Sequence, residues 1–358
     1  MGGTRLRWLG EELRRRGLAQ ENLGAIDAQT IAGAVSTGTH GTGPAFGSLA
    51  TQLAGLTLVT ASGALLECSP EQDADIFKAA QVSLGMLGII VKVKLRVVPA
   101  ALLHYHERRG KLSETLRDLE RHKQKNDHFE FYWFPYTDRV QARYLNRTNS
   151  RHVNKHSCWR RFNQFAVENY ARGLLSEMCR LVPSFCKVAC RLSGRCVATV
   201  DEINYGHRLF PAPRLVRFHE LEYSVPAEHA ITVLRQVQRS IQEHRFAVNL
   251  PVQCRFVSAD DIWLSPAYRR DTAYIAVHMY RGMPHEAYFC SMQDIFKKYS
   301  GRPHWGKMHT CTASELRALY PRWEDFQRVR RHLDPEGIFL NEYLRTLFGT
   351  DGAVCTTL

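Results

Sequence analysis

Several polar side chains that could do chemistry gather in one short string in the last third of the chain. Residues 301–309 read GRPHWGKMH and bring Arg302, His304 and Lys307 together around a proline and two glycines. A lysine held near an arginine can stabilise a developing negative charge, and a histidine titrates near neutral pH. The string does not follow the H-E-x-x-H pattern of zinc proteases, and we predict no metal site. It is a candidate for catalysis through an anionic intermediate.

Two apolar stretches before that string each carry a pair of polar side chains. Gln253 and Arg255 lie in VQCRFV, and His278 and Tyr280 lie in YIAVHMY. Because side chains alternate along a β-strand, the two members of each pair share one face. If the two strands are neighbours in a sheet, the four side chains form one polar cluster. The alternative is a buried arginine with satisfied hydrogen bonds, or an exposed sheet face.

A glycine-rich run near the N-terminus could hold a ligand. Residues 22–43 read NLGAIDAQTIAGAVSTGTHGTG and combine glycines with small hydroxyl side chains. Glycine lets the main chain approach a bulky anionic ligand, and Ser and Thr hydroxyls donate to phosphate or ring oxygens. The glycine spacing matches neither G-x-G-x-x-G nor the P-loop pattern. The alternative interpretation is an ordinary turn-rich loop.

The composition is that of a folded, basic protein. The 358 residues are 44% hydrophobic, which is enough for a large core and for two or three domains. A formal charge of +13 favours anionic partners, but no nucleic-acid motif accompanies it. We therefore predict a solvated basic surface and no nucleic-acid partner. Ten cysteines without a C-x-x-C pair indicate neither a zinc site nor a disulfide framework.

The first hundred residues predict an α+β lobe. Residues 5–17 place leucines at helical spacing, and residues 53–66 read as a hairpin that turns at Ser62-Gly63. Residues 73–84 can form a helix, and an alternating strand follows over residues 89–98. The glycine-rich run lies between the first helix and the hairpin.

The rest of the chain predicts a second α+β domain. A helix over residues 112–125 precedes an aromatic strand over 128–135 that alternates as a half-buried strand should. Strands and helices then follow at residues 216–225, 228–244, 252–257, 272–280 and 285–299. Strands that are separated by helices and pair out of sequence indicate an antiparallel sheet with helices on one face.

A basic amphipathic region over residues 160–195 bears on where the protein resides. Apolar residues recur there every three or four positions with Arg and Lys between them, and Pro183 separates two helices. Such a surface fits peripheral contact with an anionic membrane, but we favour a helical pair packed on its own domain. The chain carries no apolar stretch of membrane-spanning length and no secretion signal. We expect it to be cytoplasmic or peripheral to a membrane, and not secreted.

Seven strings together are specific enough to indicate a family. They are the glycine-rich run, SLGMLGII, DHFEFYWFPYTD, RFVSADDIWLSPAYRRDT, GRPHWGKMH, YPRWEDF and LDPEGIFLNEYL. In this order they resemble the aldonolactone oxidases, which are the L-gulono-1,4-lactone and D-arabinono-1,4-lactone oxidases of the vanillyl-alcohol-oxidase superfamily. The resemblance runs from Thr4 to Phe348 and is weakest over 147–208. It implies the second half of a VAO/PCMH-type FAD-binding domain in residues 1–100, an α+β substrate domain with an antiparallel sheet in 101–348, and a tail in 349–358.

The resemblance also implies an activity and its residues. An FAD enzyme of this kind removes hydride from a lactone carbon to flavin N5, and molecular oxygen then takes the electrons to give hydrogen peroxide. The product tautomerises to ascorbate or an analogue. The residues that match flavin-binding positions are Gly33, Ser36, Thr37, Gly38, His40 and Gly41 in the run and Gly85, Gly88 and Ile90 in a second turn. Arg255 and Lys307 match residues at the flavin ring and substrate, and His278, Tyr280 and His304 match pocket walls.

Two departures from the family pattern qualify this expectation. Gln253 stands where the family pattern E-V-R-F has a glutamate that binds sugar hydroxyls, so Gln253→Glu should raise activity if the glutamine is a handicap. The family's chain also begins well before Met1, with a lobe that cradles the FAD pyrophosphate. Two alternatives therefore stay open. One is a truncated, non-catalytic remnant or interaction partner that cannot hold FAD, and the other is a related flavin alditol oxidase or lactone dehydrogenase.

Overall fold

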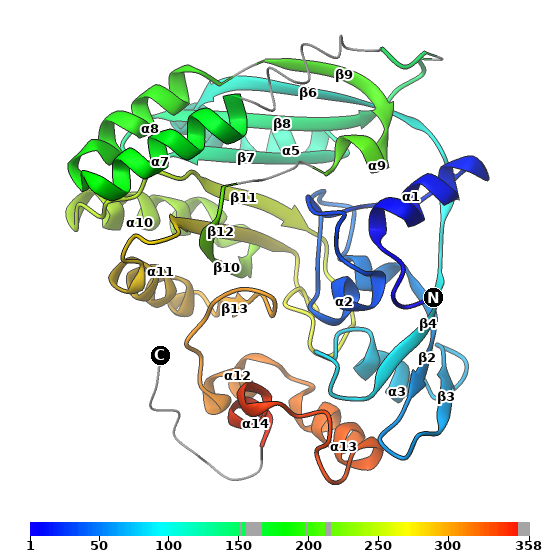
Figure 1. The fold of residues 1–358 in the computed structure, drawn as a ribbon. Coiled ribbons are helices and arrows are strands. Elements are labelled where there is room, and N and C mark those ends of the chain that lie inside the picture. Colours follow the sequence, from blue (N-terminus) through cyan, green and yellow to red (C-terminus); the bar gives the residue numbers. More distant parts are fainter. Residues whose placement is uncertain (151, 155–166, 198, 212–215, 350–358) are drawn as a thin grey trace.

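An eight-stranded sheet lies at the centre of the fold. The computed structural model describes residues 1–150, 152–154, 167–197, 199–211 and 216–349, to which all structural statements below refer. The strand order is β13-β10-β12-β11-β7-β8-β6-β9, and every neighbouring pair is antiparallel (Figure 1). The strands are β6 (Leu102–Lys111), β7 (His128–Phe134), β8 (Arg139–Arg147), β9 (Val200–Tyr205), β10 (Phe218–Pro226), β11 (Val252–Val257), β12 (Thr272–Tyr280) and β13 (Arg302–Pro303).

The N-terminal residues form a smaller α+β lobe beside this sheet (Figure 1). It contains a three-stranded sheet of order β3-β2-β4 and a two-stranded sheet of β1 and β5. Gly63 takes a positive φ of 81° in the turn of the β2–β3 hairpin, as the sequence predicts. The elements are α1 (Leu6–Arg15), β1 (Leu18–Ala19), α2 (Ile31–Ser36), a 3₁₀ turn (Leu49–Gln52), β2 (Leu53–Val59), β3 (Leu65–Cys68), α3 (Ala74–Ala80), β4 (Ile89–Leu95) and β5 (Val98–Pro99).

Helices cover the apolar face of the large sheet. His122 of α5 stacks on Phe129 of β7, and Phe296 of α11 stacks on Tyr223 of β10. Burying one large apolar side chain contributes about 1.5–3 kcal/mol, so this layer accounts for much of the domain's stability. The helices on this side are α4 (Leu112–Arg117), α5 (Leu119–Lys125), α10 (Ala230–Glu243), which a 3₁₀ turn (Ala227–His229) precedes, and α11 (Glu286–Lys298). The short helix α9 (Gly206–Leu209) follows β9, and a Cβ on its Gly206 would lie 3.4 Å from Leu103 of β6.

A helical pair packs at one end of the opposite face, so the prediction of helices on only one face of the sheet is wrong. A Cβ on Gly194 of α8 would lie 3.4 Å from the ring of Phe134 in β7, so α8 approaches the sheet closely there. The pair consists of a π-helical turn (Val167–Ala171), α7 (Arg172–Leu181), a 3₁₀ turn (Pro183–Phe185) and α8 (Cys186–Arg195). Pro183 separates the two helices as predicted, and residues 160–166 of the predicted basic region lie outside the described residues. No helix of the described residues is long and apolar enough to cross a membrane.

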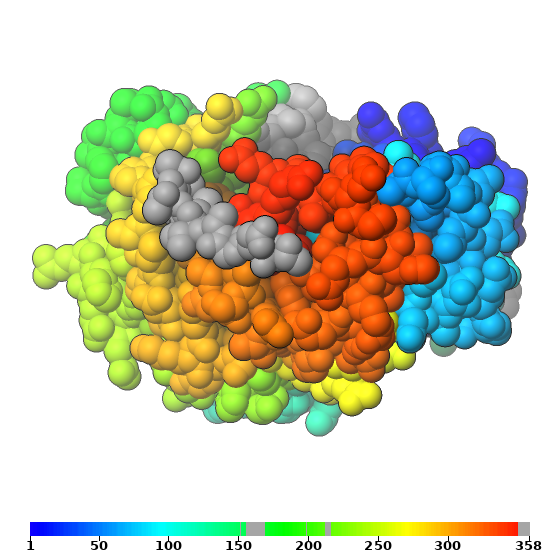
Figure 2. All heavy atoms as spheres, turned by 90° about the horizontal axis from the view of Figure 1, so that it is seen from below, coloured from blue at the N-terminus to red at the C-terminus, as the bar shows by residue number. Residues whose placement is uncertain are grey.

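Three short helices near the C-terminus connect the two parts of the molecule. They are α12 (Ala313–Leu319), α13 (Trp323–Leu333) and α14 (Glu342–Phe348). Thr312 and Glu315 form a capping box at the start of α12, and Asn341 caps α14 by accepting from the Leu344 N–H. Figure 2 shows this segment in orange and red against the N-terminal lobe in blue. The residues 350–358 of the predicted tail lie outside the described residues.

The structure corrects three predictions about single elements. The strand predicted over residues 89–98 is two strands, β4 and β5, which belong to different sheets. The helix predicted over residues 112–125 is two helices, because the backbone at Asp118 is not helical (φ −100°, ψ 17°). Strand β7, predicted to be half-buried, is buried at every residue. Helix α5 covers one of its faces, and on the other His128 bonds through Nδ1 to the Thr42 carbonyl at 2.6 Å. The glycine-rich run therefore lies against the sheet.

Candidate functional site

One face of the large sheet carries a continuous layer of polar side chains. The strand register places Glu220 opposite His278 and Arg255 opposite Glu130. Since side chains two residues apart share a face, the polar positions continue from β10 across to β6. The residues of this polar face are Glu107, Glu130, Tyr132, Gln141, Arg143, Glu220, Glu222, Gln253, Arg255, Tyr274 and His278.

Gln253 and Arg255 both bind the carboxylate of Glu130. Gln253 Nε2 donates to Glu130 Oε2 and to the Tyr132 hydroxyl, each at 2.7 Å. Arg255 Nε donates to the same Oε2 at 2.7 Å. Burial alone would raise the pKa of Glu130, but the charges of Arg255 and Arg143 hold it at about 2. The glutamate is therefore ionised at neutral pH and fixes both of its neighbours.

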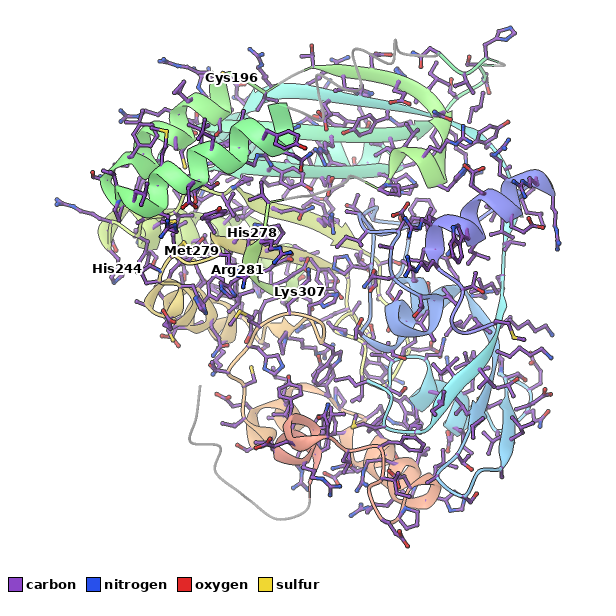
Figure 3. The ribbon with its side chains drawn as sticks, viewed as in Figure 1. Cys196, His244, His278, Met279, Arg281 and Lys307 are labelled. Atoms are coloured by element: carbon purple, nitrogen blue, oxygen red, sulfur yellow. The ribbon has the colours of Figure 1, made fainter. Side chains whose placement is uncertain are left out.

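Lys307 belongs to a second cluster on β10 and β12. Its ammonium contacts Glu220 Oε2, and Glu220 Oε1 lies 3.4 Å from His278 Nε2. The other ring nitrogen of His278 donates to the Pro251 carbonyl at 2.8 Å. Figure 3 labels His278, on β12, and Lys307, on the loop after β13, near the middle of the molecule. The two predicted cations thus contact different glutamates. Arg255 binds Glu130, and Lys307 contacts Glu220.

A third cluster joins the glycine-rich run to the sheet. His40 stacks on Tyr274 with 3.7 Å between ring centroids, and its Nε2 lies 3.3 Å from Glu222 Oε1. Its Nδ1 is 2.9 Å from the Gly41 carbonyl. Burial would raise the pKa of Glu222, but the charge and hydrogen bond of His40 hold it well below its usual range. Burial also lowers the pKa of the neighbouring His304 to about 4, so that its ring is neutral at pH 7.

The spacing of this third cluster would suit a metal ion, but its hydrogen bonds would not. The ligand atoms of His40, Glu222 and His304 all lie within 4.8 Å of one another. The N–H of Gly306 donates to His304 Nδ1 at 3.0 Å, which places the proton of the neutral ring on Nε2. Neither nitrogen of His304 then offers a lone pair to a metal. We interpret the cluster as a hydrogen-bonding network.

Three segments that are distant in the sequence meet at this face. The Leu84 N–H donates to the Ser36 carbonyl at 3.0 Å, which joins the second turn to the glycine-rich run. A Cβ on Gly306 would lie 3.5 Å from Cβ of Thr37, so the Lys307 loop also reaches the run. The Gly43 N–H donates to the Phe256 carbonyl of β11 at 2.7 Å and fixes the run to the sheet. Sequence reasoning quoted all three segments but could not place them together.

The predicted flavin-binding glycines divide into two kinds. A Cβ on Gly41 would lie 2.3 Å from Asn22 Oδ1, and one on Gly88 would lie 2.5 Å from the Val59 carbonyl, so packing requires both glycines. Gly38 and Gly85 have positive φ values of 70° and 81° but lie in roomier surroundings, and a Cβ on Gly85 would meet nothing within 4 Å. Backbone without a side chain in such surroundings fits close approach of a bulky anionic group such as FAD.

The other predicted flavin-binding residues have structural contacts of their own. The Thr37 hydroxyl donates to the Gly33 carbonyl at 3.2 Å, and the Gly33 N–H donates to Thr30 at the start of α2. Ser36 is buried at the end of α2, and Ile90 is buried in β4 opposite Leu58. Because these side chains make contacts within the protein, they would contribute to FAD binding by fixing the backbone that faces the cofactor. Their roles toward the cofactor stay predictions.

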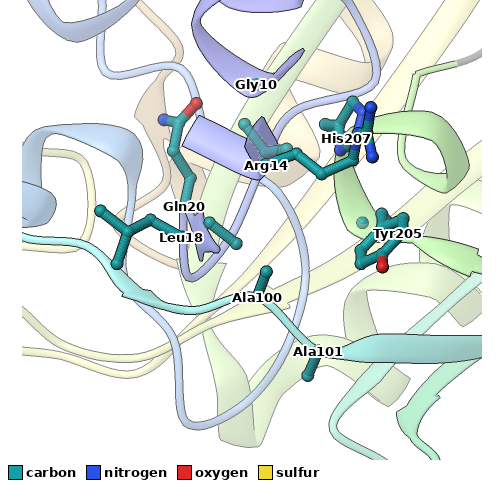
Figure 4. Close-up of a pocket in the computed structure, with 11 residues that line it drawn as sticks. Gly10, Arg14, Leu18, Gln20, Ala100, Ala101, Tyr205 and His207 are labelled. Atoms are coloured by element: carbon teal, nitrogen blue, oxygen red, sulfur yellow. The ribbon is translucent and has the colours of Figure 1, made fainter. Parts of the chain in front are cut away.

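Tyr280 lies apart from the other predicted site residues. Its hydroxyl donates to Glu177 of α7 at 3.1 Å, and it lines a hollow between α7 and the ends of β10 and β12. Figure 4 shows another small hollow, between α1 and α9, which Arg14 and His207 line. Neither hollow is lined by a residue of the three clusters.

Sequence reasoning missed four residues that hold the site together, namely Glu130, Glu220, Glu222 and Tyr274. A usable signal existed for three of them. In FHELEYSVP of β10, Glu220 and Glu222 alternate with Leu221, Tyr223 and Val225, which marks a strand with one polar face. Glu130 lies among aromatic residues in HFEFYWF, where a charged residue needs a buried partner.

Fold and site together define a class of flavoprotein, in which a glycine-rich FAD-binding lobe faces an antiparallel sheet with a charged face. A model for the FAD binding domain matches residues 1–69, and the family model for D-arabinono-1,4-lactone oxidase matches residues 93–347. The chain belongs to this family of FAD-dependent oxidoreductases.

Curated relatives match along nearly the whole chain. The L-gulono-1,4-lactone dehydrogenase of Mycobacterium tuberculosis is 42% identical over 353 residues, which are 97% of this chain and 80% of the relative. The L-gulonolactone oxidase of Mus musculus is 36% identical over 355 residues with the same shares covered. The alditol oxidase of a Streptomyces species is 30% identical over 353 residues, again with shares of 97% and 80%.

Solved structures confirm the fold. The crystal structure of cholesterol oxidase from Brevibacterium sterolicum superposes with a TM-score of 0.80 at 16% identity, over 97% of this chain and 80% of that chain. At this identity the likeness shows the fold alone. It agrees with the predicted class, a VAO/PCMH-type FAD-binding domain followed by a substrate domain with an antiparallel sheet.

Proposed function

We propose that this chain oxidises a hydroxyl-bearing carbon of a sugar 1,4-lactone of the L-gulono, D-arabinono or L-galactono type. The product is a ketolactone that tautomerises to ascorbate or a close analogue. The observation that carries the proposal is the convergence of the glycine-rich run, the turn at residues 84–88 and the Lys307 loop on the polar face of the sheet. When bound there, FAD supplies the acceptor for the hydride that leaves the carbon.

The chain's own residues contribute fixed charge and hydrogen bonds. Arg255 bonds to Glu130 through Nε, and in the described part of the chain its terminal nitrogens make no hydrogen bond, which leaves them for a ligand oxygen. Lys307 is the most exposed member of its cluster, with 22% of its side chain accessible. Such preorganised cations stabilise negative charge as it develops. The Tyr132 hydroxyl beside Gln253 adds a group that can bind a sugar hydroxyl.

The electron acceptor and the substrate can be identified in one experiment. The purified protein, supplied with FAD, is given each of the three lactones or a linear alditol, and oxygen uptake and reduction of an artificial dye are followed separately. We expect lactone-dependent oxygen uptake with formation of hydrogen peroxide. Dye reduction without oxygen uptake would indicate a dehydrogenase, and a preference for the alditol would indicate an alditol oxidase. Turnover of none of these compounds would contradict the proposal and favour the non-catalytic alternative.

We also propose that the outer face of α7 and α8 contacts an anionic membrane surface. The inner face of the pair is buried, but Leu174 and Leu181 are each 66% exposed and Val188 is 43% exposed. Arg191 and Arg195 are exposed on the same pair of helices. Apolar side chains bordered by basic ones bind at the boundary of headgroups and acyl chains, with attraction to anionic lipids.

Vesicle binding tests this surface. Sedimentation with phosphatidylcholine vesicles should carry down the protein only when phosphatidylserine is included, and added salt should weaken the binding. Leu174→Asp with Leu181→Asp should abolish it. Leu65→Asp is the matched control, because Leu65 is 71% exposed on β3 of the other lobe. Equal binding by both variants, or no binding by the wild type, would contradict the proposal.

A further inference from the structure

Strand β10 holds the Lys307 loop at two levels. In the backbone, the His304 N–H donates to the Glu222 carbonyl at 2.9 Å and the Met308 N–H donates to the Glu220 carbonyl at 3.0 Å. In the side chains, the Glu220 carboxylate contacts the Lys307 ammonium. Residue 220 therefore fixes both the path of the loop and the direction of its lysine.

The Glu220 carboxylate also contacts His278, through its other oxygen. Its Oε1 lies 3.4 Å from His278 Nε2, and the His278 ring is fixed by the Pro251 carbonyl and by an edge-to-face contact with Phe218 at 5.0 Å. The exposed fraction of the side chain rises from 4% for His278 to 14% for Glu220 and 22% for Lys307. More deeply buried groups thus support Lys307, the most exposed charged group of the cluster.

We propose that Glu220 is a positioning residue for Lys307, and that it keeps the ammonium aimed at the place where the three segments meet. The inference rests on the proposed function, in which Lys307 stabilises negative charge on the reacting ligand. Glu220 acts through the lysine and does not contact the substrate. Its removal should therefore change the properties of Lys307 even when the protein carries no substrate.

The charges around Glu220 agree with this role. Lys307, His278 and Glu222 face it from the loop, from β12 and from its own strand, and His304 lies near Lys307. Burial would raise the pKa of Glu220, but His278 and then Lys307 lower it to about 2 despite Glu222. The carboxylate is present as an anion beside the ammonium at every pH at which the enzyme would be assayed.

The direct test is the chemical reactivity of Lys307 in the FAD-loaded protein without substrate. An acetylating reagent modifies only the neutral amine, and mass spectrometry gives the rate at each lysine. In Glu220→Gln the Lys307 amine loses its carboxylate partner and is free to move into solvent. Labelling of Lys307 at pH 7.5 should therefore rise about tenfold.

A second lysine–glutamate pair supplies the matched control. Lys297 of α11 and Glu315 of α12 lie 2.7 Å apart and are not part of the polar face. Glu315→Gln should raise labelling of Lys297 and leave labelling of Lys307 and the activity unchanged. Glu220→Gln should raise labelling of Lys307, lower the activity and leave labelling of Lys297 unchanged. Equal labelling of Lys307 in the wild type and Glu220→Gln would overturn the proposal.

Kinetics give the second readout. Glu220→Gln should lower kcat about tenfold or more, because a charge-assisted contact is lost and the ammonium is no longer held toward the reacting ligand. In a Lys307→Met background, Glu220→Gln should have no further effect on kcat, and a full additional loss would overturn the proposal.

A second variant is available if Glu220→Gln fails to fold. Glu220→Asp keeps the negative charge but places it farther from the Lys307 ammonium, and increased labelling of Lys307 is again expected. Absence of lactone turnover by the wild type contradicts the proposed function, while the labelling result still tests Glu220.

Discussion

At the scale of single residues, Glu130 replaces the carboxylate that Gln253 lacks. The glutamate that the family pattern places at position 253 is absent, but a carboxylate from β7 lies 2.7 Å from the Gln253 amide and is charged. Gln253 spans this carboxylate and the Tyr132 hydroxyl, and so has a defined role as a donor. The polar face is therefore built around glutamine.

This arrangement reverses the expectation for Gln253→Glu. A glutamate at 253 would face the Glu130 carboxylate in a buried site, where an uncompensated charge costs about 3 kcal/mol. We predict a lower melting temperature and lower activity. The exchange variant Gln253→Glu with Glu130→Gln restores one carboxylate and one amide and should recover most of the loss. Higher activity of Gln253→Glu alone would contradict this account.

Arg255 is affected by the same contact. Replacing it with alanine would leave Glu130 buried without its main counter-charge, so the variant should lose stability as well as turnover. Lys307→Met is the cleaner probe, because Lys307 is more exposed and Glu220 retains His278.

His304 should make the protein less stable in mild acid. Its pKa falls from 6.5 to about 4 on folding because the ring is buried, so the unfolded chain binds the proton first as the pH falls. The stability that the neutral ring retains above pH 6.5 is lost progressively down to pH 4, by about 3 kcal/mol in total. Urea unfolding of His304→Asn, which keeps an acceptor for the Gly306 N–H, should lack this loss. The exposed His332 gives the control variant His332→Asn, and parallel curves for all three proteins would contradict the prediction.

At the scale of elements, the local sequence pattern predicted where some strands begin and end, but it did not predict which strands pair. Strands β11 and β12 were predicted with their observed bounds, because the period of two in the apolar residues is strong there. The partner of Arg255 lies 125 residues away on β7, and no local period specifies which strands become neighbours. The predicted four-membered cluster accordingly divides into a Glu130 group, a Glu220 group and the separate Tyr280.

The turn before β4 offers a test of which glycines serve packing and which serve the cofactor. Gly88→Ala places a Cβ 2.5 Å from the Val59 carbonyl at a φ of 136° and should prevent stable folding. Gly85→Ala meets open space and costs only the left-handed conformation, about 1–2 kcal/mol. We predict that Gly85→Ala folds but binds FAD more weakly than the wild type in a fluorescence titration. Unchanged FAD affinity would remove this turn from the cofactor site.

At the scale of the whole molecule, the resemblance to a known family indicated the chemistry of the protein, which the periodicity of the sequence could not indicate. Composition and charge indicate a basic folded protein and leave its chemistry open. The seven strings in order indicated the family, and the family models and relatives now show it. The roles of individual residues were the weakest part of the prediction, since Glu130, Glu220 and Glu222 hold the quoted residues in place and none of them was singled out.

The most direct test of the central claim is the visible absorbance spectrum of the purified chain with FAD, before and after anaerobic addition of L-gulono-1,4-lactone. The account predicts a bound flavin spectrum that bleaches with the lactone and recovers when air is admitted. A protein that binds no FAD, or whose bound flavin stays oxidised with each of the three lactones, would contradict it.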